Sequence, residues 1–375
     1  MLIAILHNRD HDVLEDDPGR EAREDVLRVA AALSAALQGG KRRVELFSVD
    51  RDLTAVTQEL SQKRPAVVLN LCESLHADSR GEMIVPAILD LLGLPYTGSP
   101  ALSLGLSLHK DKAKQILAGR GVPTPEFRVV RSLEELWNVD LEYPLIVKPA
   151  REDASIGIDF DSVVHDKAAL GRAVAKVLHT FHQPALVERY IEGREIYVPL
   201  LGNNPRRSLP LTEIHYGRAF ENRPKILSYR AKWEPSSAES LDSPAKPATL
   251  SPVEEAACIK TALAAFDALD CRDYGRVDLR LSNDGTPYVI DINPNCDLHP
   301  QSGFAKAASA AGIGYEDLAL HLVELARERT HGYSTPAAER STPTRRAPKP
   351  HRNVLTDRSA VRTRAHRPGV PAKPS

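Results

Sequence analysis

The sequence has no apolar run that approaches the ~18 consecutive residues a membrane-spanning helix needs. Its opening apolar stretch, residues 2–6, is too short for the core of a secretory signal, and polar and charged residues follow it at once. We therefore expect an intracellular, cytoplasmic protein that does not associate with membranes.

Cysteine is also scarce, and no two cysteines have C-x-x-C spacing. The absence of this spacing argues against a zinc site, and a chain of 375 residues is too long to depend on a disulfide framework. We expect ordinary reduced thiols at Cys72, Cys258, Cys271 and Cys296.

The net charge of −1 is close to zero, but it hides two parts of opposite sign. Residues 331–375 contain ten Lys or Arg and two acidic residues, so this tail carries +8 and the first 330 residues carry −9. The acidic body excludes a basic nucleic-acid-binding domain. Seven prolines and little apolar content predict a disordered tail, and with Tyr333 as its one aromatic residue we expect at most salt-sensitive, non-specific nucleic-acid binding.

The length predicts two or three domains at about 150 residues each. Residues 1–100 alternate strand and helix patterns, which predicts a parallel α/β domain, but G-x-G-x-x-G is absent after the first strand, so a Rossmann site is set aside. We expect a small α+β domain at 101–200, with one helix over 104–117, and a further domain at 201–330.

The third region contains two local signals. Residues 231–250 are rich in Ser, Pro and Ala and predict a long, mobile connection that could serve as a lid. Ser251, with proline after it and Glu254 three residues on, predicts the capped start of a helix that runs to about Asp267.

A predicted β-hairpin over residues 274–294 is the most informative stretch. Two alternating segments flank Asp284-Gly285, a strong turn signal. A slip of one residue would bury charges, so the pattern specifies the register. Centring the turn there predicts an apolar face that pairs Val277 with Ile292, Leu279 with Ile290 and Leu281 with Tyr288.

The other face of this hairpin pairs Asp278 with Asp291 and Arg276 with Asn293. Directly opposed Cβ atoms lie ~5 Å apart, and two carboxylates that close repel each other unless a cation or proton lies between them. Two carboxylates and an amide oxygen suit Mg²⁺ (or Mn²⁺), which typically binds few protein oxygens together with substrate phosphates. The alternative is a solvated face on which Arg276 and Arg280 pair with the aspartates, and the hairpin alone leaves both interpretations open.

With this hairpin the sequence resembles the ATP-grasp superfamily and, within it, the D-alanine–D-alanine ligases, over roughly residues 60–325. The order and spacing of the shared motifs are specific, although no single motif is. The resemblance implies the ATP-grasp fold, with an N-terminal parallel α/β domain, a central α+β domain and a C-terminal α+β domain. The shared motifs are Leu92-Gly-Leu-Pro-Tyr-Thr-Gly98, Gly121-Val-Pro-Thr-Pro125, Pro144-Leu-Ile-Val-Lys-Pro149, Val187-Glu-Arg-Tyr-Ile-Glu-Gly-Arg-Glu195, and Gly275-Arg-Val-Asp-Leu279 leading to Asp291-Ile-Asn293.

The resemblance also implies ATP as a ligand and assigns residues to it. Each lysine taken singly would be a solvated surface charge, and only the family context makes it a phosphate ligand. The matching positions are Lys110 and Lys148 (phosphates), Glu188 (adenine hinge), Glu195 (ribose hydroxyls), Lys232 (terminal phosphate, on the lid), and Ser155 and Gly157 (the loop that covers the phosphates).

The departures from the family concern the phosphate loop and the second substrate. Asp153 adds a negative charge beside the phosphates, and the family's glycine-rich N-terminal segment with its substrate-orienting glutamate has no match in residues 7–15. Ser302 falls on the family's substrate-carboxylate serine, and His76 aligns with the histidine near the first amino acid, without its glycine-rich loop. The nucleotide half thus matches the family, whereas the amino-acid half is rebuilt.

These features predict an ATP-dependent carboxylate–amine ligase that forms an amide bond through an acyl phosphate. Arg276 would stabilise the oxyanion of the tetrahedral intermediate. D-alanine as both substrates is the first expectation, and a different amino acid or small carboxylate and amine pair is the alternative. A non-catalytic nucleotide-binding protein is a rival of another class, motivated by the altered phosphate loop, and the resemblance leaves a homodimer open.

Overall fold

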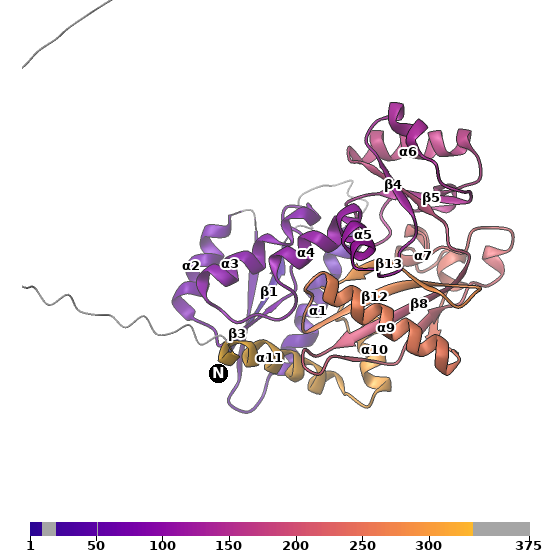
Figure 1. Ribbon diagram of the computed structural model, residues 1–375. Helices are drawn as coiled ribbons and strands as arrows, with labels where there is room; N and C mark the ends of the chain where they lie inside the picture. The colour runs from indigo at the N-terminus through magenta and orange to yellow at the C-terminus, as the bar shows by residue number, and fades with distance from the viewer. Residues whose placement is uncertain (10–19, 51, 333–375) are drawn as a thin grey trace, which may run out of the picture. The chain divides into compact units, whose positions relative to one another are not determined.

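The computed structural model describes residues 1–9, 20–50 and 52–332, and their strands form three sheets (Figure 1). The predicted disordered tail lies outside the described residues from residue 333 onward. None of the helices in the described part of the chain combines the length and the apolar character that crossing a bilayer requires.

The first sheet is parallel, with strand order β2-β1-β3, as the alternating pattern predicted. Strand β1 is buried along nearly its whole length because helices α1 and α11 cover the sheet with apolar side chains. The last described helix therefore completes the core of the N-terminal sheet. The elements are β1 (Leu2–Asn8), α1 (Arg20–Leu37), β2 (Arg43–Val49), α2 (Leu53–Lys63), β3 (Val67–Asn70), a 3-10 turn (Ser79–Gly81), α3 (Ile84–Leu92) and α11 (Tyr315–Gly332).

The predicted helix over 104–117 is in fact two helices, α4 (Ala101–Leu108) and α5 (Lys110–Gly119). His109 between them has φ −82° and ψ 78°, outside the helical region. The backbone N–H of Lys110 donates to the carbonyl of Ala150, 3.0 Å away. The break therefore places Lys110 at the start of a helix, beside the end of strand β5 (Leu145–Pro149).

The central sheet is antiparallel, with strand order β4-β7-β5-β6, and α6 (Lys167–Phe181) packs its apolar face against it. A 3-10 helix, Leu133–Asn138, follows strand β4. The remaining elements are β4 (Phe127–Val130), a 3-10 turn (Phe160–Ser162), β6 (Val163–Val164) and β7 (Ala185–Arg189).

The third sheet is antiparallel, with the order β11-β10-β8-β12-β13, and β9 pairs with β8. Helix α9 (Pro252–Ala268) packs on it and starts as predicted, since Ser251 accepts from the Glu254 N–H and Glu254 accepts from the Ser251 N–H. The other elements are β8 (Gly193–Leu201), β9 (Arg207–Ser208), β10 (Thr212–Ile214), a 3-10 turn (Arg218–Phe220), α7 (Tyr229–Trp233), α8 (Ala238–Leu241), β11 (Ala245–Pro247), β12 (Tyr274–Ser282), β13 (Pro287–Asn293) and α10 (Gly303–Ala310).

The connection over residues 231–250 is more regular than predicted. Helices α7 and α8 and strand β11 lie within or across it, and the Ser228 side chain caps α7 by accepting from the Ala231 N–H. The Trp233 indole donates to the carbonyl of Ala154 at 3.0 Å. This segment is therefore joined to the predicted phosphate loop.

The hairpin register is confirmed at its open end and wrong toward its turn. Arg276 pairs with Asn293, and Asp278 pairs with Asp291, as predicted. A β-bulge after Asp278 then shifts the register, so that β12 residues 279–281 pair with residues 289, 288 and 287 in turn. Val289 takes the core position expected for its neighbour Ile290, which instead lines a cavity on the other face of the sheet.

Candidate active site

A cavity of about 160 Å³ lies where the central and C-terminal sheets face each other. Most of the residues selected from the sequence line it, although they come from segments up to 183 positions apart in the numbering. It also has an apolar wall that includes Ile146, Ile226 and Ile290. The sequence-selected residues that line it are Lys110, Lys148, Ser155, Glu188, Glu195, Lys232, Arg276, Asp278, Asp291 and Asn293.

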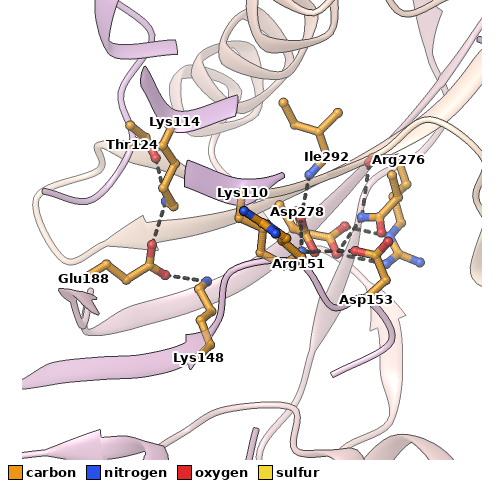
Figure 2. A network of polar contacts seen from close by, with 12 residues as sticks. Lys110, Lys114, Thr124, Lys148, Arg151, Asp153, Glu188, Arg276, Asp278 and Ile292 are labelled. Carbon is orange, nitrogen blue, oxygen red and sulfur yellow. Dashed lines mark hydrogen bonds and ion pairs between the residues drawn. The ribbon is translucent and has the colours of Figure 1, made fainter. Parts of the chain in front are cut away.

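Glu188 is the centre of a buried charge cluster in this cavity. Figure 2 shows its carboxylate between Lys114 and Lys148, and Lys114 Nζ lies 2.7 Å from one oxygen while Lys148 pairs with the other. Burial would raise the pKa of Glu188, but the two ammonium groups outweigh it and hold the pKa below its ordinary value. Burial lowers the pKa of Lys114 to about 8, although Glu188 opposes the shift.

Lys110 forms a second cluster at the start of α5. Its Nζ donates to both oxygens of Asp291, at 2.8 and 2.9 Å, and to Asp153 at 3.1 Å. Burial opposes the charge on Lys110, but these two carboxylates hold its pKa above the ordinary value. Lys110 in turn outweighs the effect of burial on Asp291 and lowers the pKa of that carboxyl. Asp153 of the predicted phosphate loop thus accepts one of the hydrogen bonds that Lys110, a predicted phosphate ligand, can donate.

The predicted metal face has the donor types that Mg²⁺ prefers. Asp278 and Asp291 are directly opposed, and the Asn293 side chain lies 3.2 Å from an Asp278 oxygen. Arg276 binds Asp278 through two hydrogen bonds of 2.6 and 2.8 Å, and burial nevertheless raises the pKa of Asp278. Within the described ranges no group of three or more His, Cys, Asp or Glu side chains could hold a metal ion. Two carboxylates and one amide fit a Mg²⁺ ion that takes its other ligands from phosphate and water.

The alternative interpretation of the hairpin predicted that Arg276 and Arg280 pair with the two aspartates. Arg276 does pair with Asp278, but Arg280 binds Glu195 at 3.3 Å and the carbonyl of Ile191 at 3.0 Å. Glu195 also accepts hydrogen bonds from the Tyr197 and Tyr216 hydroxyls, at 3.0 and 2.6 Å. The carboxylate expected to meet a ribose is therefore held in a fixed orientation by three side chains.

A second cavity of about 390 Å³ adjoins the first. Lys232, Arg276 and Asn293 line both cavities, so the two share a wall. Ser302, the predicted substrate-carboxylate residue, lines the second cavity, and its hydroxyl accepts from the Ala305 N–H as the cap of α10. Trp233, which follows Lys232 in the chain, lines only the second of the two cavities.

Two residues selected from the sequence lie elsewhere. Gly157 has φ +77°, and a Cβ there would lie 2.7 Å from the Phe181 ring and 2.8 Å from Pro149, so packing rather than phosphate contact requires the glycine. His76, at φ 62°, lines neither cavity. Neither residue lines the two cavities, and the roles that the resemblance implied for them stay predictions.

Several residues of the site were missed from the sequence. Lys114 follows Lys110 by four positions and so lies on the same helix face, a signal that was available. Tyr197 lies two positions after Glu195 on β8, on the same face of the strand. Tyr216 carried no local signal, since the fold alone brings it to Glu195.

Comparison with a solved structure first identifies the fold class of this chain. The structure of D-alanine–D-alanine ligase from Bacillus anthracis complexed with ATP is similar in fold, with a TM-score of 0.67 and 23% identity over 88% of this chain and 99% of that one. The three-sheet architecture is thus the ATP-grasp fold, as predicted.

The family follows from sequence comparison. The profile of the D-ala D-ala ligase C-terminus matches residues 116–324. D-alanine–D-alanine ligase of Desulforudis audaxviator (strain MP104C) is 32% identical over 318 residues, which cover 82% of this chain and 95% of that protein. The chain belongs to the D-alanine–D-alanine ligase family of ATP-grasp proteins. The uncharacterized protein y4sG of Sinorhizobium fredii (strain NBRC 101917 / NGR234) is 36% identical over 313 residues, 81% of this chain and 89% of that protein.

Proposed function

We propose that this protein is an ATP-dependent carboxylate–amine ligase that forms an amide bond through an acyl phosphate. The observation that carries the proposal is the wall shared by the two cavities, where Lys232, Arg276 and Asn293 face both. A terminal phosphate in the first cavity would lie beside a carboxylate in the second. D-alanine is the substrate named for several relatives, and a different carboxylate and amine pair is the alternative.

The reaction takes two steps. A carboxylate oxygen attacks the γ-phosphorus of ATP, the bond to ADP breaks, and an acyl phosphate forms. The neutral amine of the second substrate then attacks the acyl carbon, inorganic phosphate leaves with the electron pair of the C–O bond, and the nitrogen loses a proton to give the amide.

The side chains of the site are arranged to stabilise negative charge during both steps. Lys110, Lys148 and Lys232 would bind phosphate oxygens, and Arg276 would donate to the oxyanion of the tetrahedral intermediate. When bound, Mg²⁺ would be held by Asp278, Asp291 and Asn293 and would neutralise phosphate charge. Residues of α7 and of the phosphate loop line the second cavity and are joined by the hydrogen bond from Trp233 to Ala154, so they would shield the acyl phosphate from water on that side.

Replacing Asp291 with Asn tests this proposal. The change removes a carboxylate that holds Lys110 and belongs to the predicted metal face, so we expect amine-stimulated phosphate release to fall by at least about a thousandfold. Asp284→Asn in the turn of the same hairpin is the matched control and should retain activity. Full activity in the Asp291 variant would contradict the assignment.

One observation favours a second candidate, a nucleotide-binding protein without ligase activity. Asp153 bonds Lys110 and places a carboxylate among the predicted phosphate ligands. Tight ATP binding without ADP formation, across a panel of D- and L-amino acids, would support this candidate over the ligase.

A further inference from the structure

Tyr197 touches two residues that have separate roles in the proposed reaction, although the reaction leaves this tyrosine without a role of its own. It lies on β8 opposite Asp278 of β12, which in turn pairs with Asp291 of β13. Its side chain is 8% exposed and lines the first cavity. Alternate residues of a strand share a face, so Tyr197 and Glu195 lie on the same face of β8.

The hydroxyl of Tyr197 binds Glu195, the residue that the resemblance matches to ribose. It donates to Oε1 of that carboxylate at 3.0 Å. The Tyr216 hydroxyl and Arg280 both donate to the other oxygen, Oε2, so among the described residues Tyr197 is the one side chain that hydrogen-bonds Oε1. Burial, aided by the neighbouring carboxylates, raises the pKa of Tyr197 well above its ordinary value. The hydroxyl therefore keeps its proton and remains a donor.

The ring of Tyr197 supports the guanidinium of Arg276. The central carbon of that guanidinium lies 4.4 Å from the centre of the ring. A cation over an aromatic face is attracted more strongly where water is excluded, and the Arg276 side chain is 19% exposed. Asp278 holds Nε and Nη2, whereas Nη1 has no hydrogen-bond partner in the part of the chain that the structure describes. Ring and carboxylate together fix the guanidinium and leave Nη1 for a substrate oxygen.

A second tyrosine has the same two kinds of contact away from the site. The Tyr96 hydroxyl donates to Asp90 at 3.1 Å, and the guanidinium of Arg272 lies 4.9 Å from the centre of the Tyr96 ring. Tyr96 is as buried as Tyr197 but lines neither cavity. It separates what such an arrangement contributes to folding from what it contributes to a reaction.

We infer that Tyr197 is a positioning residue with two separable actions: its hydroxyl orients Glu195 toward the nucleotide ribose, and its ring holds Arg276 at the wall shared by the two cavities. The inference rests on the proposed ligase function and on the ribose contact that the resemblance implies for Glu195. One side chain would then keep the ribose ligand and the oxyanion donor aligned across strands β8 and β12. The two actions use different parts of the side chain, so substitutions can separate them.

Tyr197→Phe removes the hydroxyl and keeps the ring. Phosphate release by the full-length protein with Mg²⁺ and the amino acid that stimulates it most is measured with ATP, 2′-deoxy-ATP and 3′-deoxy-ATP. We expect kcat with ATP to stay within about twofold, whereas the preference for ATP over the less favoured deoxy analogue, as a ratio of kcat/KM, falls at least about threefold because Oε1 loses its donor. An unchanged or larger ratio, or a wild-type protein that uses all three nucleotides equally, would overturn the action on Glu195.

Tyr197→Leu removes the ring as well. Its kcat at saturating ATP and amino acid should be at least about tenfold below that of Tyr197→Phe, because the cation–π contact that holds Arg276 is lost. Equal kcat values in the two variants, whether high or low, would overturn the action on Arg276. If Tyr197→Leu does not fold, Tyr197→Met, which also lacks a ring, takes its place.

The matched controls are Tyr96→Phe and Tyr96→Leu. They lose the same kinds of contact outside the cavities, so we expect neither the ATP preference nor kcat to change. Thermal melts of all the variants compare their stability. Changes in the Tyr96 variants as large as those at Tyr197 would mean that lost stability accounts for the effects, and the inference would be wrong.

Failure of the ligase proposal has a different signature. If the wild-type protein releases no phosphate with any D- or L-amino acid, the ligase proposal fails and the action on Arg276 fails with it. Calorimetric binding of ATP and the two deoxy analogues to the wild type and to Tyr197→Phe then decides the action on Glu195. A preference for ATP that falls at least about threefold in the variant supports it, and an unchanged preference overturns it.

Discussion

The two adjoining cavities differ in how their charges are balanced. In the first cavity, the proposed nucleotide cavity, Lys110 and Lys148 each have a carboxylate partner, and Figure 2 shows these contacts together with those of the neighbouring Lys114. Lys232, which also lines this cavity, has no ion-pair partner among the described residues. In the second cavity, Glu73, Glu82 and Asp297 have no cationic partner among the described residues. The charges of the first cavity are therefore more nearly paired than those of the second.

This difference follows the sequence similarity. Most positions that match the family lie in the nucleotide cavity, although Asp153, a departure, lines both cavities and Ser302, a match, lines the second. Substitutions at glutamates in the two cavities should then have different effects on stability.

The largest effect is expected at Glu188. Changing it to Gln leaves Lys114 and Lys148 buried without a counter-charge, and breaking a buried ion pair by removing one partner costs about 3–5 kcal/mol. The free energy of unfolding, measured by urea denaturation at pH 7, should fall by that amount. Glu73→Gln is the matched change in the other cavity and should not destabilise the protein, because its side chain is exposed and no cation among the described residues pairs with it. Similar losses in both variants would remove the contrast.

A second prediction concerns the pH dependence of stability. Burial raises the pKa of Glu82 well above its ordinary value of 4.5, so above pH 4.5 the unfolded chain has released a proton that the folded chain retains. The free energy of unfolding should therefore decrease as the pH rises above that value. In Glu82→Gln this decrease should become smaller.

Urea unfolding at several pH values measures this slope. Glu255→Gln serves as the control, since its side chain is exposed and its removal should leave the slope unchanged. An unchanged slope in Glu82→Gln would mean that Glu82 ionises as readily in the folded state as in the unfolded state.

Local sequence patterns predicted most of the helices and strands. They failed where neighbouring residues are equally apolar or where no glycine or proline marks a break. The Ser251 cap and the facing of Asp278 and Asp291 follow from residue type and period, and the structure has both. The bulge could not be predicted, because Val289 and Ile290 are both apolar and alternation does not tell which faces inward. The helix break at His109 likewise has no glycine or proline to mark it.

The nucleotide cavity was more predictable than the second for a similar reason. Its ligands lie in motifs whose order and spacing are visible in the sequence, and the structure brings most of them together. The acids of the second cavity come from positions 73, 82 and 297, and only the tertiary fold places them on one wall. No local pattern distinguishes them from ordinary surface carboxylates.

The smallest predicted effect concerns Asp153, the one acid of the phosphate loop that contacts a nucleotide lysine. Its carboxylate bonds Lys110 at 3.1 Å, with 41% of its side chain exposed, so phosphate must displace a weak, solvent-screened pair. Asp153→Asn should therefore lower the KM for ATP by about threefold, a change typical of one exposed ion pair, with little change in melting temperature. Steady-state phosphate release at saturating amine measures it, with Asp161→Asn in the following turn as the control for the loss of charge. A higher KM in Asp153→Asn would instead mean that this carboxylate helps to bind the nucleotide, and the charge of the phosphate loop would then belong to the balanced cavity rather than oppose it.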